Sequence, residues 1–153
     1  MKFIGEIQCN VDDKGRVKLP VSFKKHFVDT PIKFMIAKDI EDCLVIYPIA
    51  TWEKQEQMLM KLNDFNPTHR AFKNTITLGL TEIELDSADR FLISKQLMKY
   101  LGSAKEVILK GQFDRIQIWD SSKYETYTNA NIGNVEQMAA DVAKYLDNIN
   151  DNK

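Results

Sequence analysis

One short sequence pattern occurs twice in the chain, and this repetition limits the folds open to it. Residues 5–16 (GEIQCNVDDKGR) return as residues 79–90 (GLTEIELDSADR), at an offset of 74 positions. Residues 38–52 return as residues 110–124, at an offset of 72. A unit of about 45 residues lies near the lower limit for a domain that folds alone. We therefore expect the two copies to pack against each other around a shared core.

Alternating apolar and polar residues predict a strand over residues 3–11 and a return strand over 16–19. The DDKG segment between them is a turn signal, and Gly15 supplies the positive φ that such turns require. The predicted hairpin places Arg16 and Lys18 together on its polar face. The equivalent turn in the second copy begins at Asp86.

Further apolar segments predict more short strands and helices, so the fold class is α+β. In the last segment, apolar residues recur at spacings of 3 and 4, which is typical of an amphipathic helix. We divide the chain into repeat 1 (residues 1–53), a helical connector (54–76), repeat 2 (77–128) and a C-terminal amphipathic helix (134–149).

Charge is unevenly distributed along a chain whose net charge is −1. Nucleic-acid-binding proteins usually carry a basic domain or a basic face, so basic character must here be local. Residues 13–26 have five basic side chains and one acidic side chain, and the matching residues 87–100 have three and one. The first copy is therefore the more electropositive.

The residues that usually carry enzymatic chemistry are few and scattered. His26 and His69 lie in unrelated contexts, and Cys9 and Cys43 have neither CxxC spacing nor a histidine partner pattern. We therefore expect no enzymatic activity, no catalytic residues, no metal site and no cofactor. No hydrophobic segment approaches the length of a membrane span, and the N-terminus lacks the apolar core of a signal peptide. We expect a cytoplasmic protein without a membrane partner.

The repeated Asp-x-x-x-Arg pattern has a structural and a functional interpretation. Asp12 can accept hydrogen bonds from turn amides, and Arg16 can pair with a carboxylate of the same turn. Alternatively, Arg16 and Lys18 project toward DNA, since a two-stranded ribbon is thin enough to enter the major groove. Arginine suits bidentate contact with guanine and lysine suits phosphate. Further phosphate contacts would then come from nearby lysines: Lys14, Lys24 and Lys25.

Four segments resemble the MraZ family. They are VDDKGRVKLP (11–20), followed by Phe23-Lys24; CLVIYP (43–48), with Trp52-Glu53; ELDSADR (84–90); and IQIWD (116–120). The resemblance extends over residues 1–146 with order and spacing intact. It implies two tandem SpoVT/AbrB-like repeats that interleave into one pseudo-symmetric, β-rich, barrel-like domain with short helices and a C-terminal helix.

The resemblance also implies a function. The family expectation is a nucleoid-associated bacterial transcription regulator that assembles into a ring-shaped homo-oligomer. It would bind repeated promoter sites in double-stranded DNA and repress the division and cell-wall gene cluster that includes its own operon. In the family, the arginine of Asp-x-x-x-Arg lies on the DNA-binding face, and this role falls here on Arg16 and Arg90.

The second copy departs from the family pattern. Asp89 stands where the family has glycine, Ser94 replaces a proline, and Met98 replaces a basic residue. Asp89 tolerates a positive φ better than most residues, but its charge beside Arg90 would repel phosphate. We therefore assign DNA contact mainly to the first copy.

Two alternatives remain. A ring-forming interaction scaffold could bind an acidic protein partner through the basic hairpin. An antitoxin-like autoregulator is disfavoured by the two copies and by the predicted C-terminal helix.

Overall fold

The computed structural model describes residues 2–102 and 105–152, which belong to two compact units, Met1–Ser121 and Ser122–Lys153. The strands are β1 (Glu6–Asn10), β2 (Arg16–Lys18), β3 (Lys33–Lys38), β4 (Leu44–Pro48), β5 (Thr81–Glu84), β6 (Arg90–Leu92), β7 (Glu106–Gly111) and β8 (Ile116–Asp120). The helices are α1 (Val21–Lys24), α2 (Ile49–Met60), α3 (Pro67–Ile76), α4 (Lys95–Met98), the 3-10 helix η1 (Lys99–Leu101), α5 (Ser121–Ile132) and α6 (Val135–Asp151).

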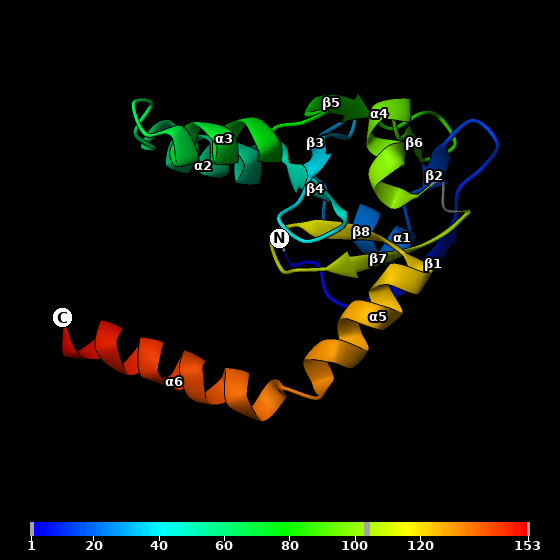
Figure 1. Cartoon of the computed structure of the whole chain (residues 1–153). Coiled ribbons are helices and arrows are strands. Elements are labelled where there is room, and N and C mark those ends of the chain that lie inside the picture. Colours follow the sequence, from blue (N-terminus) through cyan, green and yellow to red (C-terminus); the bar gives the residue numbers. More distant parts are fainter. Residues whose placement is uncertain (1, 103–104, 153) are drawn as a thin grey trace. The chain divides into compact units, whose positions relative to one another are not determined.

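The strands of the two copies interleave. Six strands form one antiparallel sheet in the order β1-β7-β8-β4-β3-β5, and β2 pairs with β6 in a separate two-stranded ribbon. Strands β1 and β7 come from different copies and lie side by side, as do β3 and β5, and β4 and β8 (Figure 1). The expected α+β class with two tandem, interleaved repeats is confirmed. Each copy therefore completes the sheet of the other.

The predicted hairpin of residues 3–11 and 16–19 is wrong in its pairing. After the turn, a single bridge joins Val11 to Val17, and β2 then pairs with β6 rather than with β1. The reason is burial, because Val17 and its cross-strand neighbour Phe91 lie directly opposite each other and are both almost fully buried. A ribbon with one strand from each copy encloses both apolar side chains together, which a local hairpin would not do.

One hydrophobic core connects the ribbon to the six-stranded sheet. The rings of Phe34 in β3 and Phe91 in β6 meet edge to face, with centroids 5.4 Å apart. Both belong to a single buried cluster, whose other members include Val17, Leu19, Ile36, Leu44, Ile46, Leu109, Ile116 and Ile118. A second cluster lies between the sheet and α2, where Trp52 packs against Tyr47. Since side chains from both copies fill the main core, neither copy retains it alone.

Gly111 allows the edge of the sheet to close. A Cβ atom at this position would lie 2.6–2.7 Å from backbone atoms of Phe3 and Ile4, whereas the present glycine donates its N–H to the carbonyl of Gly5. Backbone atoms cannot move aside as the end of a side chain can. The close approach of the N-terminal segment to β7 therefore requires glycine here.

We expect Gly111→Ala to lower the free energy of unfolding by about 2 kcal/mol, since it forces extra volume against backbone. Chemical denaturation measures this change. Gly133→Ala is the matched control, because a Cβ there would meet atoms no closer than 3.8 Å. It should change stability by less than about 1 kcal/mol. Equal stability of the two variants would contradict the close approach at Gly111.

Candidate nucleic-acid interface

Asp12 organises the turn that precedes β2. Its Oδ1 accepts the main-chain N–H groups of Lys14 at 3.0 Å and Arg16 at 2.8 Å. Its Oδ2 accepts the Nε–H of Arg16 at 2.7 Å. The carboxylate thus supports the turn and orients the guanidinium group through one of its five N–H donors. Both interpretations of the motif are compatible with this geometry, since the pair is structural and still presents an arginine.

The second turn repeats the same arrangement. Asp86 Oδ1 accepts the N–H groups of Ala88 at 2.8 Å and Arg90 at 2.9 Å, and Oδ2 accepts Arg90 Nε at 3.0 Å. The two ion pairs are also similarly exposed, at 28% and 37% of the side chain for Arg16 and Arg90. The duplication of the sequence therefore extends to the atoms of the motif.

The two turn carbonyls tie the copies together. Gly15, with φ at +85°, accepts the N–H of Ile93 at 2.9 Å, and Asp89, with φ at +61°, accepts the N–H of Leu19 at 2.8 Å. The left-handed conformation that glycine adopts in the first turn is thus kept by aspartate in the second, as its backbone tolerance allows. The substitution of glycine by aspartate preserves the turn.

The β2–β6 ribbon gathers three predicted cations on one face. Val17 and Phe91 point into the core, so the residues on either side of them face outward. In the register of the ribbon, Lys18 lies opposite Arg90 and Arg16 lies opposite Leu92. Like charges directly opposite each other destabilise an antiparallel pair. The ion pair with Asp86 reduces this repulsion, and Lys18 and Arg90 together still present N–H donors suited to an anionic ligand.

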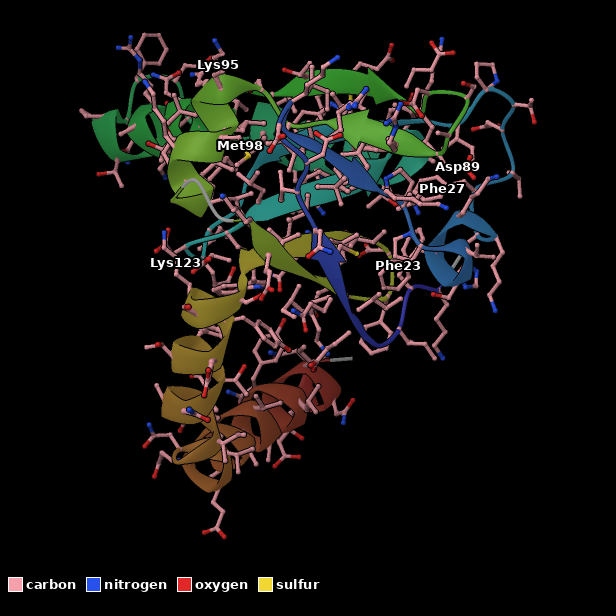
Figure 2. The ribbon with its side chains drawn as sticks, turned by 90° about the vertical axis from the view of Figure 1, so that its right-hand side faces the viewer. Phe23, Phe27, Asp89, Lys95, Met98 and Lys123 are labelled. Atoms are coloured by element: carbon pink, nitrogen blue, oxygen red, sulfur yellow. The ribbon has the colours of Figure 1, made fainter. Side chains whose placement is uncertain are left out.

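Lys24 and Asp89 form an ion pair between the copies. Lys24 Nζ at the end of α1 lies 3.0 Å from Asp89 Oδ1, although the two residues are 65 positions apart. Figure 2 shows Asp89 at the end of the ribbon that faces α1, near Phe27. The predicted repulsion of phosphate by Asp89 is therefore accompanied by a second effect that the sequence did not indicate. Asp89 forms an ion pair with Lys24, one of the lysines assigned to phosphate contact.

The remaining predicted cations lie beside the ribbon. Lys25 lines the same depression of about 500 Å³ as Lys24 and Asp89, and Lys14 is exposed at the tip of the first turn. Two lysines that the sequence did not single out, Lys95 and Lys105, line a depression of about 350 Å³ together with Lys14. Lys95 corresponds to Val21 of the first copy. The position of Lys95 beside the first turn could have been predicted only if the second copy had been expected to pack around that turn.

The described residues contain neither a metal-binding cluster nor a membrane-spanning helix. Among residues 2–102 and 105–152, no group of three or more His, Cys, Asp or Glu side chains is placed to hold a metal ion. In the same residues, no helix is long and apolar enough to cross a membrane. Cys43 is buried, and burial raises the pKa of its thiol, which opposes formation of the nucleophilic thiolate.

Acid should weaken both turns. The main-chain N–H of Arg16 is the largest cause that lowers the pKa of Asp12 below its ordinary value, and the N–H of Arg90 acts in the same way on Asp86. Because the folded pKa is depressed, the stabilisation is complete above the unfolded value of about 3.9 and is lost as the pH falls through the folded pKa.

Carboxyl titration by NMR checks this expectation. Asp12 and Asp86 should titrate below the ordinary value, and Arg16→Ala should raise the pKa of Asp12 part of the way, since the main-chain donor remains. In the same variant, the pKa of Asp86 is the internal control and should not change. An ordinary pKa for Asp12 in the unmodified protein would show that the turn does not form in solution.

Sequence comparisons agree with this geometry. The sequence model of the family described as "MraZ protein, putative antitoxin-like" matches twice, over residues 2–75 and 76–145. The chain is 38% identical over 137 residues to a protein of Clostridium tetani named transcriptional regulator MraZ, covering 90% of this chain and 94% of that protein. Proteins of the same name from Moorella thermoacetica and Shigella sonnei are 35% and 30% identical, over 90% and 96% of this chain and 94% and 98% of theirs. The chain belongs to the MraZ family, and it contains two tandem MraZ domains.

Proposed function

We propose that this protein is a sequence-specific DNA-binding transcriptional regulator whose β2–β6 ribbon contacts the DNA. The observation that carries the proposal is the outward face of the ribbon, where Arg16, Lys18 and Arg90 lie together on strands from both copies. The relatives carry the name of a transcriptional regulator and not that of an enzyme. This name supports a role in transcription, and the ribbon supplies the surface for it.

The ribbon has the dimensions and donors that the major groove requires. A two-stranded β-ribbon fits this groove, and arginine can donate two hydrogen bonds to guanine O6 and N7. The carboxylates of Asp12 and Asp86 hold the Nε edge of each arginine, so less side-chain freedom is lost on binding. Arg90 therefore enters the proposed interface beside Arg16, despite the acidic residue that precedes it.

Lysines supply the contacts to the DNA backbone. Lys14 and Lys18 are exposed beside the arginines, and Lys25 is exposed next to α1. Lysine neutralises phosphate and releases counterions without requiring a fixed geometry. Lys24 contributes less, since it is paired with Asp89.

The near-neutral net charge is compatible with this function if several copies bind together. We propose a ring-shaped homo-oligomer that binds repeated promoter sites, because later contacts then form at high effective concentration. We further propose that the sites lie upstream of the protein's own operon, in the division and cell-wall gene cluster, and that binding represses transcription. The protein would then act in the cytoplasm, associated with the nucleoid.

A ring-forming scaffold that binds an acidic protein partner is the alternative, and the net charge of −1 is the observation that favours it. A basic ribbon on a near-neutral protein attracts DNA weakly over long range. Charge reversal by Arg16→Glu separates the two functions when binding to DNA and to the protein partner is measured side by side.

We expect Arg16→Ala to weaken binding to DNA from upstream of the protein's own operon by about 5- to 150-fold, since a bidentate base contact contributes roughly 1–3 kcal/mol. A mobility-shift titration at several salt concentrations measures this loss. Arg70→Ala is the matched control, because Arg70 is an exposed arginine on α3, outside the ribbon. Equal binding by the two variants, or no preference over random DNA, would contradict the proposal.

Removal of the negative charge at residue 89 should have the opposite effect. Asp89→Asn keeps the tolerance for a positive φ but releases Lys24, so we expect tighter binding and a salt dependence steeper by up to about 0.9 in log–log slope. Asp64→Asn is the control, since it releases Lys73 from an ion pair of 2.8 Å outside the ribbon. An unchanged salt dependence in Asp89→Asn would show that Lys24 does not reach phosphate.

A further inference from the structure

The outer face of the ribbon contains one apolar side chain among its cations. In the described part of the chain, this face consists of Arg16, Lys18, Arg90 and Leu92, and Leu92 is 51% exposed. The equivalent residue of the first copy, 74 positions earlier, is Lys18. The second copy thus presents a leucine where the first presents a lysine.

Burial in the core does not account for Leu92. The neighbouring Phe91 is 1% exposed and belongs to the main core cluster, whereas Leu92 lies outside that cluster. Its Cδ1 atom would lie 3.8 Å from a Cβ placed on Gly15, so the side chain leans across the ribbon toward the first turn. Leu92 therefore lies next to the turn that holds Arg16, and opposite Arg16 in the strand register.

We propose that Leu92 contacts the C5-methyl group of thymine in the major groove. The inference rests on the proposed function, in which the ribbon enters that groove. Thymine is the base that presents an apolar group at this edge, whereas the neighbouring groups are hydrogen-bond donors and acceptors. A leucine opposite an arginine therefore matches a thymine next to a guanine.

The energetic gain is modest and specific. Burial of one methyl group should increase the affinity about fourfold. The contact is confined to one side of the ribbon, because Lys18 occupies the equivalent position on the other side, opposite Arg90. Leu92 thus makes the two ends of a pseudo-symmetric ribbon chemically different, and the preference for thymine should be associated with the first turn.

Replacement of thymine by uracil tests the contact without knowledge of the operator. DNA from upstream of the protein's own operon is amplified with either dTTP or dUTP, so that the two fragments differ in the C5-methyl group at every thymine. The unmodified protein should bind the uracil fragment about fourfold more weakly for each methyl group contacted. The ratio of the two affinities should be smaller in Leu92→Ala than in the unmodified protein, because alanine is too short to make the same methyl contact.

Three further variants define the origin of the discrimination. Leu92→Met keeps an apolar side chain of similar volume and should retain the preference for thymine. Leu92→Lys should lose the preference and steepen the log–log salt dependence by up to about 0.9, because it adds a phosphate contact. Ile40→Ala removes a 72%-exposed apolar side chain from the β3–β4 connection and should behave like the unmodified protein.

The outcomes separate the contact from the proposed function. Uracil also changes DNA flexibility, but this affects every variant equally, so the ratio of the two affinities is compared between proteins. An equal ratio in Leu92→Ala and the unmodified protein, with tight and salt-sensitive binding in both, would overturn the contact and leave the proposed function intact. Absence of sequence-selective binding by the unmodified protein would overturn both.

Discussion

The pairing of β2 with β6 is the constraint on which the fold and the proposed interface both depend. It brings Val17 of one copy against Phe91 of the other, and both side chains are then almost fully buried in the common core. The same pairing places Lys18 beside Arg90 on the opposite face. Since side chains alternate along a strand, burial of the inner face fixes the outer face as well. The cationic surface is therefore a direct consequence of core formation between the copies.

Duplication provides this ribbon with symmetry, and three substitutions remove it. The motif geometry of Asp12 and Arg16 recurs in the second copy almost unchanged. Around it, however, the equivalent positions differ in charge: Gly15 and Asp89, Lys18 and Leu92, Val21 and Lys95. The first turn consequently has lysines from both copies around it, and the second turn has an ion pair between Asp89 and Lys24 of the first copy. A symmetric scaffold thus carries two chemically different ends.

The sequence predicted the copies, the two turns and the alternation of β2, because each is encoded by residues close together in the chain. It did not predict the partner of β2, since alternation shows which face is buried but not what buries it. The turn signal after Val11 favoured a local hairpin. The residue that instead pairs with Val17 is Phe91, which lies 74 positions later in the chain and could not be identified from local sequence. The pairing of Lys24 with Asp89 escaped prediction for the same reason, because it forms only after the copies interleave.

The acidic residues of the motif would oppose DNA binding only if charge were counted without geometry. Each Asp–Arg pair is close to neutral, so it attracts DNA weakly over long range, whereas the terminal N–H donors of the arginine are effective at contact distance. In the proposed interface, long-range attraction to DNA would therefore come mainly from the lysines, and salt would screen this attraction strongly. In that interface, arginines would determine the geometry of contact and lysines would determine its strength. A protein with this division needs no large positive charge, provided that several copies bind neighbouring sites.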